Sequence, residues 1–142
     1  MQNKKWCKGA GRLGVLVVCL WMVLSGCSIE KANRTKVRDL DYRIVAVEEI
    51  PEELLMQIET KKTADFKMTY ETTEQLYIVR GYGEQVTGGY SIQVKELYLS
   101  NNAVFFATEL IGPRKGETIT KSPSYPYIVL VTEKVDKNVV FE

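Results

Sequence analysis

The amino-acid sequence predicts a mainly β domain of the α+β class. We expect an antiparallel sheet or sandwich of about six or seven strands with one packed amphipathic helix, preceded by a signal peptide. Short runs of alternating apolar and polar residues recur from residue 42 to the C-terminus, with glycine, proline and asparagine between them. Only residues 51–62 have the apolar spacing of a helix. A chain of 142 residues has room for one such domain.

The domain begins with a strand expected from Tyr42 to about Val47, which is rich in β-branched residues. In the helix that follows, Pro51 suits the first position, because the missing N–H of proline would have no partner there. Acidic residues come next, and Lys61 and Lys62 end the segment, which is the charge order that the helix dipole favours. The apolar stripe consists of Leu54, Leu55 and Ile58. This helix is therefore expected to pack on a sheet.

The next strands differ in how many of their faces are apolar. Residues 66–70 alternate, which predicts one buried face, whereas residues 76–83 are apolar on both faces, as in the centre of a sheet. Gly88–Gly89 are expected to supply positive φ or a close backbone approach where the following strand begins. That strand changes its apolar phase, which predicts a β-bulge near Lys95 and Glu96.

Two more strands and two loops complete the domain. Asn101–Asn102 suits a two-residue hairpin loop, because asparagine tolerates positive φ. Loops are expected at 111–118 and 122–127. The Tyr125–Pro126 bond in the second is a candidate for the cis form, because an aromatic residue before proline favours it somewhat, although trans is the commoner form. Residues 127–134 are the most continuously apolar strand and are expected inside the sheet. The last residues are compatible with a short edge strand.

The N-terminal residues are similar to a bacterial lipoprotein signal. A basic segment and an apolar core of about a dozen residues precede Leu24, Ser25, Gly26 and Cys27. This order resembles the lipobox, in which the peptidase requires small residues and the cysteine thiol accepts the lipid. The alternative is an uncleaved transmembrane anchor, but the apolar core is shorter than the roughly 20 residues that span a bilayer.

The predicted organisation has three parts. Residues 1–26 are a lipoprotein signal peptide, residues 27–40 a polar tether and residues 41–142 the folded domain. Lipid on Cys27 would anchor the protein to the bacterial cell membrane, with the domain outside the cytoplasm. Membrane lipid is therefore the first expected partner.

The composition excludes several chemistries. The chain has no histidine, so a Ser-His-Asp or Cys-His catalytic arrangement cannot exist within it. The three cysteines, Cys7, Cys19 and Cys27, all precede the domain, which excludes a disulfide framework and a four-ligand zinc site. Four basic residues and no acidic ones lie in the first 26 positions, so the rest of the chain is mildly acidic and a nucleic-acid partner is not expected. No metal or cofactor is predicted.

Two sets of polar residues keep an enzyme as the alternative. Lys121 and Ser122 are a conceivable serine–lysine pair, although each is more simply a solvated loop residue. The candidate carboxylates are Glu84, Glu96, Glu109 and Glu117. Nucleotide binding is not supported, because Val86 stands at the third glycine position of a dinucleotide fingerprint and a strand follows where a helix is required.

Tyrosines beside the loops suggest a binding surface. Tyrosine is favoured at interfaces because it offers a large contact area with little rotamer entropy and one polar group. Taken singly, each ring more simply covers the sheet. The four are Tyr82, Tyr90, Tyr125 and Tyr127.

Four motifs occur in a distinctive order: GEQVTGGYSIQV at 83–94, the hairpin after it, a Gly-Pro loop, and SYPYIVLV at 124–131. With them, residues 76–131 resemble the C-terminal domain of the protease complex subunit PrcB family. The resemblance implies a non-catalytic accessory domain that associates with a secreted or surface protease, often in a bacterial lipoprotein. The motif positions, which the resemblance marks as fold-defining or interacting, are Thr87, Gly88, Gly89, Tyr90, Ile92, Pro126 and Tyr127.

The leading hypothesis is a membrane-anchored, extracytoplasmic lipoprotein that binds a partner protein and stabilises or positions a secreted or surface protease. One alternative is an envelope enzyme that acts on cell-wall glycan through the carboxylates or the Ser/Lys pair. Another is a lipoprotein that senses a small molecule.

Overall fold

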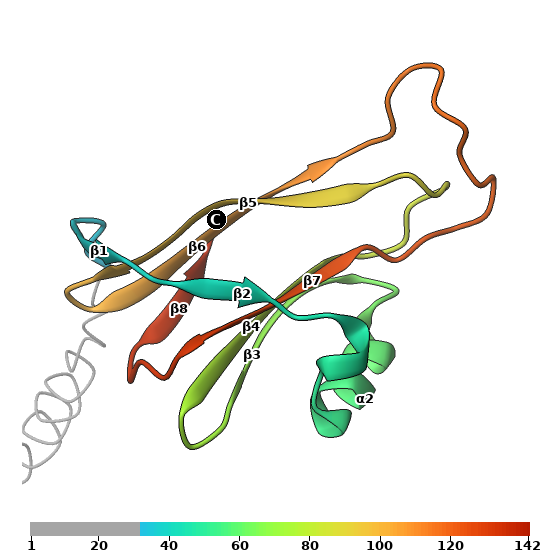
Figure 1. Ribbon diagram of the computed structural model, residues 1–142. Coiled ribbons are helices and arrows are strands. Elements are labelled where there is room, and N and C mark those ends of the chain that lie inside the picture. The colour runs from blue at the N-terminus through green and yellow to red at the C-terminus, as the bar shows by residue number, and fades with distance from the viewer. Residues whose placement is uncertain (1–31) are drawn as a thin grey trace, which may run out of the picture. The chain divides into compact units, whose positions relative to one another are not determined.

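The computed structural model describes residues 32–142, which form one unit (Figure 1). The predicted signal peptide and lipobox, Cys27 included, lie outside the described residues. The elements are β1 (Lys36–Asp39), β2 (Tyr42–Ile44), the 3-10 helix η2 (Val47–Glu49), α2 (Glu52–Lys61), β3 (Asp65–Glu71), β4 (Gln75–Tyr82), β5 (Ser91–Ser100), β6 (Ala103–Ile111), β7 (Tyr127–Glu133) and β8 (Asn138–Phe141). The mainly β class with one α-helix is confirmed for the described part of the chain.

The strands form two sheets of four. The order in the first sheet is β1-β5-β6-β8, and the order in the second sheet is β2-β7-β4-β3. Every pairing is antiparallel except that of β6 with β8, which is parallel. The expected antiparallel arrangement therefore holds for every pairing except this one at the edge of the first sheet. Strand β8 reaches β6 by crossing from the second sheet rather than through a hairpin, so no tight turn dictates its direction.

Three layers result: α2, the second sheet and the first sheet (Figure 1). The helix buries Leu54 and Ile58 against side chains such as Val79 and Val129 on one face of the second sheet. The other face packs against the first sheet around Ile78, Leu130, Val104 and Phe106, among others. Fully burying one such apolar side chain contributes about 1.5–3 kcal/mol to stability. Strands β4 and β7 are therefore apolar on both faces, as predicted for interior strands.

The N-terminal elements differ from the prediction. The expected strand ends at Ile44, and Val47–Glu49 form a 3-10 turn in which the Glu49 N–H donates to the Ala46 carbonyl at 2.9 Å. Strand β1 lies in the range predicted as tether. Its residues are all exposed and mostly charged, so they show no alternation, and only Leu40 after them is buried. The unit that the structure describes therefore extends N-terminal to residue 41.

The helix begins one residue later than expected. Pro51 is its cap rather than its first residue, and the Pro51 carbonyl accepts a hydrogen bond from the Leu55 N–H at 2.9 Å. Glu52 and Glu53 occupy the first turn and Lys61 the last turn, as the helix dipole favours.

The register of the β5–β6 hairpin agrees with the sequence pattern. Val94 pairs with Thr108 and Glu96 pairs with Ala107, which leaves Lys95 as the extra residue of the predicted bulge. Asn101–Asn102 form the two-residue connection. All peptide bonds between described residues are trans, including Tyr125–Pro126.

The far end of this hairpin extends beyond its neighbours in the first sheet. Strand β1 pairs with residues 98–100 of β5, and β8 pairs with residues 103–106 of β6. The far end, residues 91–96 with 107–111, is consequently a two-stranded ribbon, and it leads into the loops that project at the upper right of Figure 1. No helix among residues 32–142 is long and apolar enough to cross a membrane.

Candidate interaction surface

Two loops lie side by side at the end of the ribbon and form one projection, which we call the lobe (Figure 1). They are residues 83–90, between β4 and β5, and residues 112–126, between β6 and β7. Gln85 and Ser124 form an isolated antiparallel bridge, with N–H to carbonyl distances of 2.8 and 3.0 Å. The Gly88 N–H donates to the Thr120 carbonyl at 2.9 Å. Backbone pairing therefore joins two loops that are distant in the sequence.

The lobe continues the ladder of the two central strands of the second sheet. Gly81 pairs with Tyr127 at the end of the β4–β7 ladder, and the Tyr82 N–H then donates to the Pro126 carbonyl at 3.0 Å. One step further, the Ser124 hydroxyl donates to the Thr87 carbonyl at 2.6 Å. The register of the sheet thus determines how the two loops meet.

Of the Gly88–Gly89 pair, Gly89 is the one that needs both a special backbone angle and space. Its φ is +83°, and a Cβ placed there would lie 2.9 Å from Ile119 Cγ2 and 2.9 Å from Pro113 Cβ. Gly88 is not among the described glycines with positive φ, and its nearest neighbour would be Thr120 Cβ at 3.4 Å, an ordinary contact. The expected positive φ and close approach therefore occur at Gly89. Gly88 instead donates its N–H to the Thr120 carbonyl, which joins the two loops.

The base of the lobe is attached to the end of α2. The Glu84 N–H donates to the Thr63 carbonyl at 3.2 Å, and Lys62 Nζ lies 5.7 Å from the centre of the Tyr125 ring. The Tyr125 hydroxyl donates to Glu84 Oε2 at 3.0 Å. This hydrogen bond, with the nearby negative charge, raises the pKa of Tyr125 above 10.0, while Lys62 opposes the shift.

A buried arginine lies on β4 close to the point where the first loop of the lobe begins. Arg80 lies on β4 and is only 9% exposed; its guanidinium donates to Asp65 Oδ2 at 2.8 Å and to the Phe66 carbonyl at 3.1 Å. The group also lies 4.0 Å from the centre of the Tyr82 ring, and the Tyr82 hydroxyl contacts Thr108 Oγ1 at 2.7 Å across the two sheets. The apolar pattern of β4 obscured Arg80 in the sequence.

Three of the loop tyrosines have contacts within the protein: Tyr82 and Tyr125 form hydrogen bonds, and Tyr127 packs against the core between α2 and the second sheet. Tyr82, Tyr90, Tyr125 and Tyr127 are all half-buried. Burial and the Glu59 charge raise the pKa of Tyr127, against the effect of Lys62. The remaining motif positions, Thr87, Ile92 and Pro126, are likewise half-buried, whereas Gly89 is exposed.

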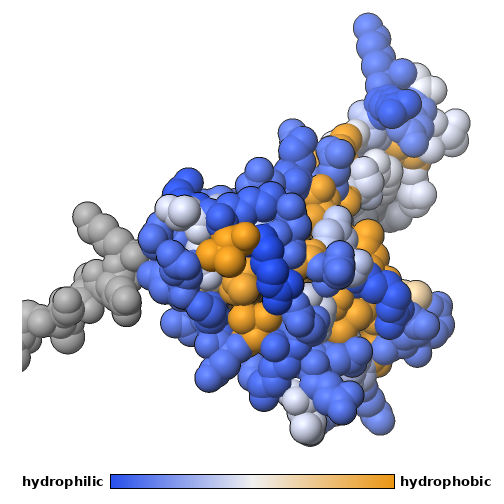
Figure 2. Space-filling view, turned by 60° about the vertical axis from the view of Figure 1, so that its left-hand side comes forward, coloured by the Kyte–Doolittle hydropathy of each residue, from blue (hydrophilic) through white to orange (hydrophobic). Residues whose placement is uncertain are grey.

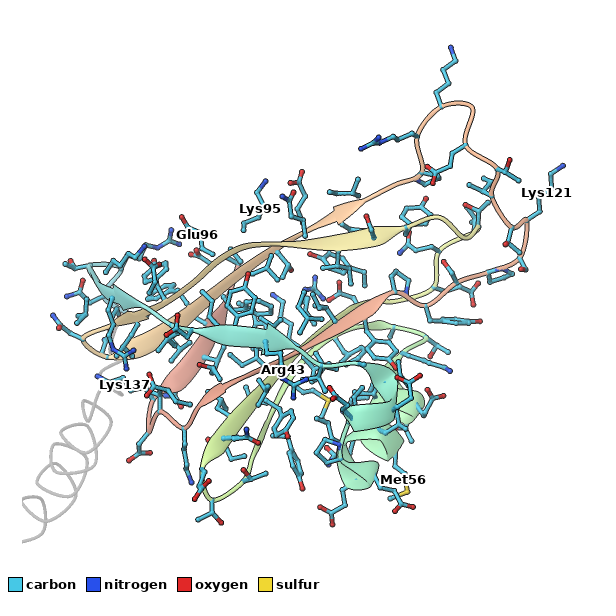
Figure 3. The ribbon with its side chains drawn as sticks, viewed as in Figure 1. Arg43, Met56, Lys95, Glu96, Lys121 and Lys137 are labelled. Carbon is cyan, nitrogen blue, oxygen red and sulfur yellow. The ribbon has the colours of Figure 1, made fainter. Side chains whose placement is uncertain are left out.

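The surface that the lobe offers to a partner consists of other residues. Val86 is 79% exposed, the highest value among the exposed large apolar side chains of residues 32–142. Arg114, Lys115 and Lys121 are exposed on the second loop, and none of them forms a salt bridge within the described chain. Lys121 projects outward in Figure 3, and Figure 2 shows apolar surface in patches between charged side chains. The lobe therefore combines one apolar contact point with three cations and two exposed carboxylates, Glu84 and Glu117.

The residues considered for catalysis are not gathered into a site. Glu84 accepts from Tyr125, the Lys95 ammonium lies 3.0 Å from Glu109, and Glu117 accepts from the Arg114 N–H at 2.9 Å. Glu96 is exposed on β5, and Lys121 and Ser122 are exposed loop neighbours.

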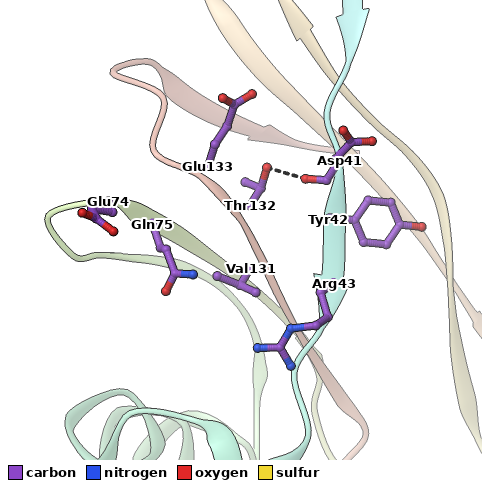
Figure 4. Close-up of a pocket in the computed structure, with 8 residues that line it drawn as sticks. All are labelled: Asp41, Tyr42, Arg43, Glu74, Gln75, Val131, Thr132 and Glu133. Atoms are coloured by element: carbon purple, nitrogen blue, oxygen red, sulfur yellow. Dashed lines mark hydrogen bonds between the residues drawn. The ribbon is translucent and has the colours of Figure 1, made fainter.

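A shallow depression of about 450 Å³ lies at the end of the second sheet opposite the lobe (Figure 4). Three of its polar side chains already have partners: the Thr132 hydroxyl donates to the Asp41 carbonyl at 2.7 Å, Arg43 pairs with Glu49, and Glu133 pairs with Arg38. The lining residues are Asp41, Tyr42, Arg43, Glu74, Gln75, Val131, Thr132 and Glu133.

Comparison with known proteins agrees with the motifs. Residues 76–133 match the family model described as PrcB C-terminal, which confirms the predicted resemblance. The matched segment runs from β4 through β7 and contains both loops of the lobe. No curated protein and no solved structure matches the chain.

Replacing Gly89 with alanine is expected to destabilise the protein more than the same change at Gly116. Both glycines have positive φ, at +83° and +87°, but a Cβ at Gly116 meets nothing within 4 Å. The left-handed backbone costs each variant about 1–2 kcal/mol, and the crowding at Gly89 adds about 1–3 kcal/mol. Urea unfolding of the full chain measures the difference. An equal loss of unfolding free energy in the two variants would mean that Ile119 and Pro113 do not enclose Gly89.

Replacing Glu84 with glutamine is expected to lower the pKa of Tyr125 toward 10.0, its ordinary value. Because folding raises this pKa, the contribution of Tyr125 to stability is complete below the unfolded pKa and is lost as the pH rises through the folded pKa. An ultraviolet titration of the phenolate, corrected with a Tyr125→Phe variant, measures the shift. Glu117→Gln is the control, since Glu117 contacts a backbone amide. An unchanged titration in Glu84→Gln would contradict the hydrogen bond.

Proposed function

Because residues 76–133 match the PrcB C-terminal family, we propose that this chain is a non-catalytic subunit that binds a protein partner within a protease complex. The lobe is the proposed contact surface. The observation behind this proposal is that the loops within the matched segment are paired with each other, yet expose Val86 and three cations. A partner would find this surface already ordered, so binding would cost little conformational entropy.

The chemistry of the lobe favours a protein partner with an apolar cavity and acidic groups around it. Val86 is a compact apolar side chain that fits such a cavity, and the cations on the second loop of the lobe would attract an acidic surface. Arg114, Lys115 and Lys121 have no carboxylate in a salt bridge within residues 32–142. Such a partner would supply the missing negative charge.

The proposal includes a membrane anchor. The order Leu24-Ser25-Gly26-Cys27 after an apolar core supports lipidation of Cys27, and two or three acyl chains would hold the protein firmly at a membrane. The domain would then act outside the cytoplasm, close to a secreted or surface protease. The role is that of a subunit that stabilises or positions the enzyme.

Val86→Asp is expected to reduce the recovery of the partner at least about tenfold, because an interface anchor contributes more than about 1 kcal/mol and a buried unpaired charge is costly. The tagged full chain is cross-linked in its native cells, purified and analysed by mass spectrometry, with a protease or a subunit of its complex as the expected partner. Met56→Asp is the matched control: Met56 is 57% exposed, and it projects from α2 away from the lobe (Figure 3). Recovery of no partner, or equal recovery with Val86→Asp, would contradict the proposal.

A further inference from the structure

Exposed apolar side chains are concentrated in one short stretch near the start of the described chain. Within residues 32–142, seven large apolar side chains are exposed, and four of them lie between Val37 and Val47. Their exposed fractions are 55% for Val37, 43% for Tyr42, 57% for Ile44 and 52% for Val47. Two of them, Tyr42 and Ile44, lie on the same face of β2, because side chains two residues apart in a strand share a face. The stretch includes β2, the edge strand of the second sheet.

The backbone of β2 is open on the side away from β7. The Val45 N–H donates to the Val129 carbonyl at 2.9 Å, and the register continues through Arg43 opposite Val131. In an antiparallel ladder, alternate residues bond toward the same neighbour, so Arg43 also bonds toward β7. The N–H and carbonyl groups of Tyr42 and Ile44 consequently point away from β7, and both residues are exposed, at 43% and 57%. This edge offers two donors and two acceptors at the spacing of a β-strand.

Two of the other three sheet edges, β3 and β1, are protected against strand pairing. Strand β3 has charged residues along its length, and the guanidinium of Arg80 occupies the Phe66 carbonyl at 3.1 Å. Strand β1 has an irregular register between Lys36 and Arg38, and Lys36 pairs with Asp39. Charges and bulges of this kind are how natural sheets prevent edge-to-edge association. The single charge on β2, Arg43, is already paired with Glu49.

We propose that the edge of β2 binds an extended segment of a partner polypeptide by strand addition. Main-chain hydrogen bonds from Tyr42 and Ile44 would hold the segment, and their side chains would contact apolar residues at alternate positions of it. This deepens the proposed function, since it assigns a second contact to the same partner-binding role, but it rests on a surface separate from the lobe.

A second copy of this chain is a poorer occupant of the edge. Symmetric pairing of β2 with β2 of a second copy would join only three residues from each chain, which falls far short of the roughly 800 Å² per partner of a stable interface. A short extended segment requires neither the symmetry nor the area.

The probe is a phage-displayed library of linear heptapeptides, selected against the full chain in detergent micelles. We expect enrichment of sequences with apolar residues at alternate positions. Ile44→Pro removes the outward N–H without removing a bond to β7, and it should weaken binding of a selected peptide at least about tenfold. Ile44→Lys leaves the backbone intact and places a charge on the edge, so it gives the same test if the proline variant fails to fold.

Two control variants test whether the peptide binds at the edge of β2 rather than elsewhere on the protein. Met56→Lys and Val86→Asp, which alter the helix and the lobe, should leave peptide affinity unchanged. No enrichment, or peptides that bind Ile44→Lys as well as the unmodified chain, would overturn the proposal. So would a dimer in sedimentation experiments that Ile44→Lys abolishes, because a second copy would then occupy the edge. If the edge fails while the Val86-dependent partner is still recovered, the proposed function stands without it.

Discussion

The antiparallel pairing of β4 with β7 is the interaction on which the rest of this structure depends. Its register runs from Gln75 opposite Glu133 to Gly81 opposite Tyr127, and it continues past the strand ends to the Gln85–Ser124 bridge. Because one face of this pair packs on α2 and the other on the first sheet, the pair connects all three layers. A slip of one residue would reverse both faces and separate the two loops. The lobe is therefore a consequence of the central register.

The largest polar group buried in this strand pair, the guanidinium of Arg80, has its interaction partners within the same part of the structure. Arg80 brings a guanidinium into a strand that is otherwise apolar, and it has a carboxylate, two backbone carbonyls and an aromatic ring as partners. Among the described residues, no buried side-chain nitrogen or oxygen lacks a hydrogen-bond partner. A buried guanidinium that makes three hydrogen bonds restricts how the end of β4 can move. This restriction acts next to Tyr82, where the first loop of the lobe begins.

The features that were predicted from the sequence are those that local chemistry determines. The two-sided apolar runs identified β4 and β7, Asn101–Asn102 identified the hairpin, and the phase change near Lys95 identified the bulge. Each depends on residues close together in the chain. The glycine motif belongs to the same group, because a backbone angle is a local property.

The features that were not predicted depend on distant parts of the chain. Strand β1 has no apolar alternation because it is a charged edge, and the parallel direction of β8 results from a crossing between sheets. The pairing of Gln85 with Ser124 joins positions that no periodicity links. For the same reason the sequence drew attention to the loop tyrosines, which prove to be half-buried, rather than to Val86, which is exposed.

Amide hydrogen exchange of the full chain tests the central claim most directly, namely that the ladder of β4 and β7 continues into the loops and orders the lobe. The account predicts that the amides of Gln85, Gly88 and Ser124, which donate to backbone carbonyls, exchange far more slowly than that of Lys115 at the tip of the second loop. Exchange of all four at the same rapid rate would contradict it, because the two loops would then be independent of each other.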